Sequence, residues 1–184
     1  HFTATLSTIT FPYLFDDHWY VLFLAVVFFI LLFISRHRTY LKSIHDIQRI
    51  SVGSFLLPVA IYITFLLAYK LNDFFLFILP MLVLAICDPI AGILGINLQQ
   101  YNHRIRIFKH TFEKTWLGST AFFISCLIIS IIALYFNQGH LNLNTFMVAV
   151  VVAFVSTIAE LFSWKGVDNL FIPLSVFIVL FLML

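Results

Sequence analysis

Three acidic side chains lie inside or beside the long apolar runs of this chain, where a charge is costly. Asp88 interrupts one run, Glu160 lies near the end of another, and Asp168 directly precedes the last one. An acid next to hydrocarbon needs a partner or a water-filled cavity, so each is a functional candidate. Mg²⁺ accepts a few carboxylates and completes its shell with waters and phosphate oxygens. Together with the amide oxygen of Asn169, the three acids predict a magnesium site.

A basic segment follows the run that contains Asp88. It reads YNHRIRIFKHTFEK and carries Arg104, Arg106, Lys109 and Lys114. Arginine offers forked donors and lysine a compact charge, and both hold phosphates. Carboxylates for a metal and cations for phosphates favour phosphoryl transfer from a nucleoside triphosphate, in which the protein mainly positions the reactants and neutralises charge.

Several of these residues also have purely structural interpretations. Gly118 and Ser119 open the next apolar run, and the N–H groups of that helix start could hold a phosphate or simply be capped. Asp168 and Asn169 could cap the last helix. The basic side chains could act only as topology signals or anionic-lipid contacts. Asp88 is the deepest acid and is therefore our candidate for accepting the proton of an attacking alcohol.

The composition excludes an ordinary soluble domain. Of 184 residues, 62% are hydrophobic and only 10% are charged, and the mean hydropathy is +1.07. These values are typical of a polytopic membrane protein. Cys87 and Cys126 both lie in apolar runs without CxxC spacing, which predicts small packing residues rather than a disulfide or a metal site. The absence of GxxxxGK[ST] argues against a P-loop ATPase.

Six apolar runs can form membrane-spanning helices, since a span needs roughly 20 residues and fewer where its ends reach headgroups. They are Trp19–Ile34, Gly53–Leu71, Phe74–Leu94, Leu117–Phe136, Leu143–Phe162 and Leu170–Leu184. Residues 1–18 are mixed polar and aromatic, which predicts an extracytoplasmic interfacial segment. Pro89 predicts that the third span bends or breaks near Asp88-Pro89. The expected fold is an all-α helical bundle, a single transmembrane domain over residues 1–184.

The basic residues predict the orientation. Segments 35–52, 95–116 and 163–169 contain nine of the ten Lys and Arg residues. The positive-inside rule puts these segments in the cytoplasm and both termini outside. We therefore expect a multi-pass protein of the plasma or inner membrane or of the ER, with its active site on the cytoplasmic side. Residues 95–116 would form a basic, nucleotide-binding loop.

Three strings of this sequence resemble blocks of a known family. They are CDPIAGILG (Cys87–Gly95), KTWLGS (Lys114–Ser119) and AELFSWKGVDNLFIPL (Ala159–Leu174). In order and spacing they resemble the polyprenol kinase family of CTP-dependent lipid kinases, which includes phytol kinase, dolichol kinase and the yeast-type CTP-dependent diacylglycerol kinase. The likeness covers residues 49–184. The positions that match the family pattern are Asp88, Lys114, Gly118, Ser119, Glu160, Asp168, Asn169 and Pro173.

The resemblance implies a Mg²⁺-dependent transfer of phosphate from CTP to the hydroxyl of an isoprenoid alcohol or of diacylglycerol. The sequence departs from the family pattern at two places. Leu117 stands where many members have Glu, which removes one possible metal or base ligand. Residues 95–98 lack the usual basic, glycine-containing stretch, which leaves the nucleotide contacts to Arg104, Arg106 and Lys109. CTP rests on the resemblance alone, because no spacing here separates a cytosine from an adenine pocket.

Two other functions fit the same residues. A phosphatidate cytidylyltransferase would use CTP and Mg²⁺ but release pyrophosphate. An ion-coupled transporter would use the acids as a relay, although they gather at one face and the hydropathy shows no inverted repeat. The expected partners are a lipid alcohol, a nucleoside triphosphate and the bilayer. No nucleic-acid partner is expected, and the sequence is compatible with a homodimer.

Overall fold

The computed structural model describes residues 2–37, 53–97, 104–107, 110–164 and 166–184. The helices are α1 (Phe2–Thr8), α2 (Phe11–Leu14), α3 (His18–His37), α4 (Gly53–Leu71), α5 (Phe75–Asn97), α6 (Trp116–Gln138), α7 (Leu143–Phe162) and α8 (Asp168–Met183). The strands are β1 (Arg104–Ile107) and β2 (His110–Thr115). Within the described residues, α4, α5, α6 and α7 are long and apolar enough to cross a membrane, and His18–Ile34 and Asp168–Met183 are shorter apolar helices. The prediction of an all-α membrane bundle is confirmed.

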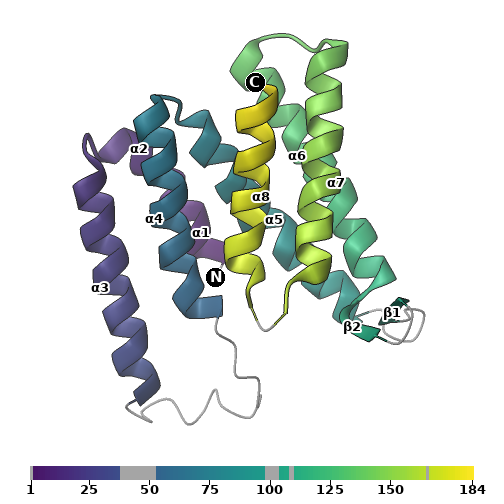
Figure 1. The fold of residues 1–184 in the computed structure, drawn as a ribbon, viewed down its shortest axis with the longest axis horizontal. Coiled ribbons are helices and arrows are strands. Elements are labelled where there is room, and N and C mark those ends of the chain that lie inside the picture. The colour runs from purple at the N-terminus through teal and green to yellow at the C-terminus, as the bar shows by residue number, and fades with distance from the viewer. Residues whose placement is uncertain (1, 38–52, 98–103, 108–109, 165) are drawn as a thin grey trace.

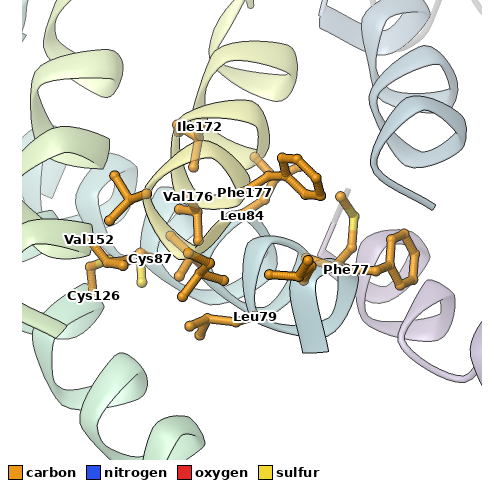
Figure 2. Close-up of a cluster of buried hydrophobic side chains, with 14 of the residues drawn as sticks. Phe77, Leu79, Leu84, Cys87, Cys126, Val152, Ile172, Val176 and Phe177 are labelled. Carbon is orange, nitrogen blue, oxygen red and sulfur yellow. The ribbon is translucent and has the colours of Figure 1, made fainter. Parts of the chain in front are cut away.

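Helix α5 lies at the centre of the bundle and contacts α1, α4, α6 and α8. Helices α6, α7 and α8 pack on one another in sequence order, and α3 packs on the outer side of α4 (Figure 1). The core consists of apolar side chains from α3, α4, α5, α6, α7 and α8, and Leu84, Val152 and Val176 are among them (Figure 2). The outward faces are apolar as well: Phe154 is 60% and Leu182 is 74% exposed. Such faces suit contact with lipid.

Cys87 and Cys126 lie close to each other in this core (Figure 2). Both are free thiols and both are fully buried. The Cys126 sulfur lies 3.3 Å from the Ser156 hydroxyl oxygen. The prediction that they are packing residues rather than a disulfide is confirmed.

The expected break in the third span is absent. Helix α5 continues through Pro80 and Pro89 to Asn97. Pro89 cannot pair with the carbonyl of Ala85 in the preceding turn. A spanning helix tolerates that loss where neighbouring helices pack against it, and here α6 and α8 do so. Asp88 is therefore presented by a continuous helix.

The segment predicted as interfacial, residues 1–18, contains α1 and α2. Helix α1 packs against α5, and its Thr5 and Thr8 side chains are buried. Ala4 lines a cavity together with Leu57 and Ile61, which lie one to two turns inside α4. This part of the chain therefore lies within the depth of the bundle. The hydroxyls of Ser7 and Thr8 donate to carbonyls of their own helix, so α1 can pack against apolar neighbours.

Part of the basic loop predicted for residues 95–116 is a β-hairpin. Strands β1 and β2 pair antiparallel, with Arg106 opposite Thr111 and Ile107 opposite His110. The sequence RIRI alternates charged and apolar residues, a period of two that is typical of a half-buried strand. This signal predicts the strand that the loop assignment missed.

Candidate functional site

Lys114 forms two ion pairs with acids from other elements. Its Nζ lies 2.8 Å from Oε1 of Glu160 on α7 and 3.4 Å from Oδ2 of Asp168 on α8. The Glu160 side chain is only 2% exposed, compared with 24% for Lys114 and 17% for Asp168. A carboxylate buried to this degree requires a counter-charge, and Lys114 supplies it.

The ends of three elements place these side chains together. Lys114 is the penultimate residue of β2, Glu160 lies in the last turn of α7, and Asp168 begins α8. Thr115 caps α6, because its Oγ1 accepts a hydrogen bond of 3.2 Å from the Gly118 backbone N–H. The sharp passage from β2 into α6 leaves the Lys114 side chain directed at the ends of α7 and α8.

The backbone N–H of Gly118 takes part in this cap. Of the two interpretations of this helix start, phosphate binding and capping, the structure shows capping. A Cβ at Gly118 would lie 3.0 Å from Thr115 Oγ1 and 3.1 Å from the Ala91 carbonyl oxygen. The missing side chain thus lets α6 approach α5 closely, as small residues do between membrane helices.

Ser119 binds the other oxygen of Glu160. Its hydroxyl donates a hydrogen bond of 3.1 Å to Glu160 Oε2, and both residues are buried. Glu160 is therefore held at both carboxylate oxygens, by Lys114 and by Ser119. This makes Ser119 a positioning residue for Glu160.

Asp88 belongs to the same cluster. It is half-buried on α5 and interacts electrostatically with Asp168, Lys114 and Glu160. Among the side chains that the structure describes, three carboxylates face one ammonium group, so this part of the cluster has more acidic than basic groups. Among the described residues Asp88 forms no ion pair as close as those of Lys114, which leaves its oxygens available to a proton or a cation.

Asn169 is engaged elsewhere. Its Nδ2 donates a hydrogen bond of 2.9 Å to the Gly53 carbonyl oxygen at the start of α4. Its backbone N–H donates to Asp168 Oδ1 at 3.0 Å. The N-cap of α8 is Val167, without a side-chain cap, so the prediction that Asp168 or Asn169 caps this helix is wrong. Asn169 ties the start of α4 to the start of α8, where Asp168 lies.

We expect Gly53→Ala to disturb this tie. A Cβ at Gly53 would lie 2.7 Å from Asn169 Nδ2 and 2.8 Å from the Gly166 carbonyl oxygen. Such overpacking costs about 1–3 kcal/mol, so thermal unfolding in detergent should show a lower midpoint. Gly92→Ala is the control, because no atom lies within 4 Å of its added Cβ. A Gly53→Ala protein as stable as Gly92→Ala would contradict the close contact.

Burial and charge act in opposite directions on Lys114. Burial favours the neutral amine and would lower its pKa. The charges of Glu160 and Asp168, the hydrogen bond to Glu160 and the charge of Asp88 outweigh burial, so the pKa of Lys114 is raised above its ordinary value. Lys114 is therefore a fixed cation rather than a base.

The described residues do not by themselves form a complete metal site. Among them, no group of three or more His, Cys, Asp or Glu side chains is arranged to hold an ion. The ammonium of Lys114 lies between Glu160 and Asp168 instead. The carboxylates still fit Mg²⁺ chemically, because this ion is commonly held by one or two carboxylates together with substrate phosphates. Magnesium binding stays a prediction.

The predicted phosphate-binding residues are only partly placed. Arg104 and Arg106 belong to β1. Their side chains and all of Lys109 lie outside the described residues. Lys114 is the one of the four whose side chain the structure places, and it lies in the acidic cluster.

The sequence grouped the acidic residues correctly but did not predict the side-chain contacts between them and their partners. It did not predict the Lys114–Glu160 pair, the Ser119–Glu160 hydrogen bond or the tie between Asn169 and Gly53. The sequence held one signal for the Lys114–Glu160 pair. An acid in an apolar run needs a cation, and Lys114 is the basic residue nearest to the start of the predicted span Leu117–Phe136.

Compared with models of protein families, with curated proteins and with solved structures, the chain matches none. The residues, their geometry and the likeness of the three sequence blocks are what indicate a function for this protein.

Proposed function

We propose that this protein is a membrane-embedded lipid kinase. It would transfer the terminal phosphate of a nucleoside triphosphate, CTP by the resemblance, to the hydroxyl of an isoprenoid alcohol or of diacylglycerol. The observation that carries the proposal is the cluster of Lys114, Glu160, Asp168 and Asp88 at one end of the bundle. Each of these residues lies in one of the three blocks that resemble the polyprenol kinase family.

Lys114 would bind the phosphates of the nucleotide. An ammonium group has three donors, and Glu160 and Asp168 take two of them. The third is then available to a phosphate oxygen. Glu160, which Ser119 holds by a hydrogen bond, pairs with the lysine from the buried side. The charge of Lys114 is therefore positioned before the nucleotide arrives, which is how protein charges stabilise phosphoryl transfer.

Asp88 would act on the alcohol. In the proposed step the alcohol oxygen forms a bond to the terminal phosphorus, the bond from that phosphorus to the bridging oxygen of the nucleotide breaks, and the alcohol proton passes to Asp88. The nucleoside diphosphate leaves. A carboxylate without a close ion pair can accept such a proton.

Asp88 and Asp168 would hold Mg²⁺ together with phosphate oxygens. When bound, the ion neutralises charge on the phosphates. In this arrangement Glu160 positions Lys114, and Asn169 positions the start of α8. The sequence instead predicts a direct metal contact for both residues and a nucleotide contact for Asn169.

We also propose that this end of the bundle faces the cytoplasm. Gly53 directly follows the basic segment 35–52, Lys114 lies in segment 95–116 and Asp168 lies in segment 163–169. Asn169 donates a hydrogen bond to Gly53, and Lys114 forms an ion pair with Asp168, so the three segments meet at this end. The positive-inside rule assigns such a face to the cytoplasmic side.

The decisive experiment identifies both products. Purified protein is incubated with γ-labelled CTP, ATP, GTP or UTP and with geranylgeraniol, a longer polyprenol or diacylglycerol. We expect label in the organic phase, with CTP the best donor and CDP released. Pyrophosphate in place of CDP would instead show a cytidylyltransferase. Solute movement in liposomes without nucleotide turnover would show a transporter.

A further inference from the structure

A cavity of about 190 Å³ lies between α1, α3 and α4. Its walls include Ala4 from α1, Ala25 and Phe28 from α3, and Leu57 and Ile61 from α4. An engineered cavity of about 150 Å³ with aliphatic and aromatic walls is large enough to bind benzene. This cavity therefore has room for part of a hydrocarbon chain.

The lining offers almost nothing to a polar ligand. Ser7 and Thr8 are the only hydroxyl-bearing residues among the lining residues. The Ser7 hydroxyl donates to the Ala4 carbonyl oxygen at 2.8 Å, and the Thr8 hydroxyl donates to the Thr5 carbonyl oxygen at 2.7 Å. Both hydroxyl protons are used within α1, so the occupant must be apolar.

Helix α4 connects this cavity to the candidate site. Leu57 lies one turn after Gly53, which is about 6 Å along the helix axis. The Gly53 carbonyl accepts the hydrogen bond from Asn169, the neighbour of Asp168. Helix α4 therefore lines the cavity and, one turn earlier, contacts the residue next to Asp168.

Resting on the proposed function, we propose that the cavity between α1, α3 and α4 binds the hydrocarbon chain of the lipid alcohol substrate. A single isoprenoid or alkyl chain fits the apolar walls and the volume, and α4 links the cavity to the neighbour of Asp168. Helix α1 is then one wall of a binding site, which gives a reason for its position inside the bundle.

Photo-crosslinking of the full chain in nanodiscs tests this. The probe is a geranylgeraniol analogue with a diazirine on its chain, and labelled peptides are mapped with and without excess geranylgeraniol. We expect competed labelling on α1, α3 and α4. Ala25→Phe fills the cavity and should lower this competed labelling at least tenfold. Val26→Phe should label like the wild type, because Val26 is 47% exposed and outside the lining.

Two results would overturn the proposal. One is equal labelling of Ala25→Phe and wild type. The other is labelling that excess geranylgeraniol does not displace, which indicates ordinary surrounding lipid. If Ala25→Phe does not fold, the smaller Ala25→Leu takes its place, with a several-fold decrease expected. The activity assay and the labelling assay test the two proposals separately. A wild-type protein that makes no phosphorylated lipid with any nucleotide would refute the proposed kinase. Labelling that excess geranylgeraniol displaces would still establish that the cavity binds a hydrocarbon chain.

Discussion

Lys114→Met should lower the free energy of unfolding by about 3–5 kcal/mol, because removing one partner of a buried ion pair leaves the other charge uncompensated. Here the uncompensated charge is that of Glu160, whose side chain is 2% exposed. Phosphate transfer should be lost as well. Stability is measured by denaturant titration in mild detergent, and transfer by labelled product.

A double variant separates the structural role of Lys114 from its role in transfer. Lys114→Met with Glu160→Gln removes both charges, and a neutral pair of similar volume is often tolerated in a protein interior. We expect most of the stability to return while transfer remains absent. The control is Lys70→Met, an exposed lysine at the opposite end of α4, with an expected change within about 0.5 kcal/mol.

Two outcomes would contradict this account. If the double variant were as unstable as Lys114→Met alone, Lys114 would stabilise the fold by something other than charge compensation. If the double variant transferred phosphate at the wild-type rate, Lys114 would not bind the nucleotide.

The same ion pair predicts how stability depends on alkaline pH. The pKa of Lys114 is raised in the folded state. Its contribution is therefore fully present below the ordinary lysine pKa of 10.5 and is lost as the pH rises through the higher folded-state pKa. The double variant Lys114→Met with Glu160→Gln should lack this loss of stability at alkaline pH. Thermal unfolding measured over a range of pH tests the difference from wild type.

Asp88→Asn should lower kcat by about 10²–10⁴-fold, the usual contribution of a positioned acid–base group. The fold should be unharmed, because burial and the repulsion by Asp168 and Glu160 together outweigh the attraction of Lys114 for a charged Asp88, and a neutral amide does not carry these costs. Initial rates of CDP release over a range of CTP and alcohol concentrations give kcat and KM.

The matched control is Asp73→Asn, just before the other end of α5. Asp73 Oδ1 accepts a hydrogen bond of 3.0 Å from the Phe75 backbone N–H, and asparagine can accept it equally well. We expect an unchanged rate there. A wild-type rate in Asp88→Asn would show that this acid is structural, and a large loss of stability would show a partner that the proposal lacks.

The helices themselves could be predicted from the sequence because their signal is local. A window of about 20 apolar residues is enough to specify a span in a membrane, and all six predicted runs became helices with bounds close to those expected. The candidate site could be predicted as a set of residues for a similar reason. The cost of an acid beside hydrocarbon depends on its immediate sequence surroundings, which singled out Asp88, Glu160 and Asp168.

The local signals were weaker where packing overrides them. Pro89 is compatible with a continuous α5 only because neighbouring helices support the helix. Residues 2–8 read as an interfacial segment, yet α1 lies against α5. Neither result follows from a single window of sequence, since each depends on which surface covers the segment.

The contacts within the site depend on the tertiary structure alone. Lys114 and Asp168 are 54 positions apart, Ser119 and Glu160 are 41 apart, and Asn169 and Gly53 are 116 apart. The sequence determined that acids and cations would gather at one end of a helical bundle, because hydrophobic length and charge placement are local properties. Only the packing of α4, α5, α6, α7 and α8 decided that Lys114 neutralises Glu160 and that no described side chain forms a close ion pair with Asp88. The reason is that ion pairing depends on distances of a few ångströms between elements far apart in the chain.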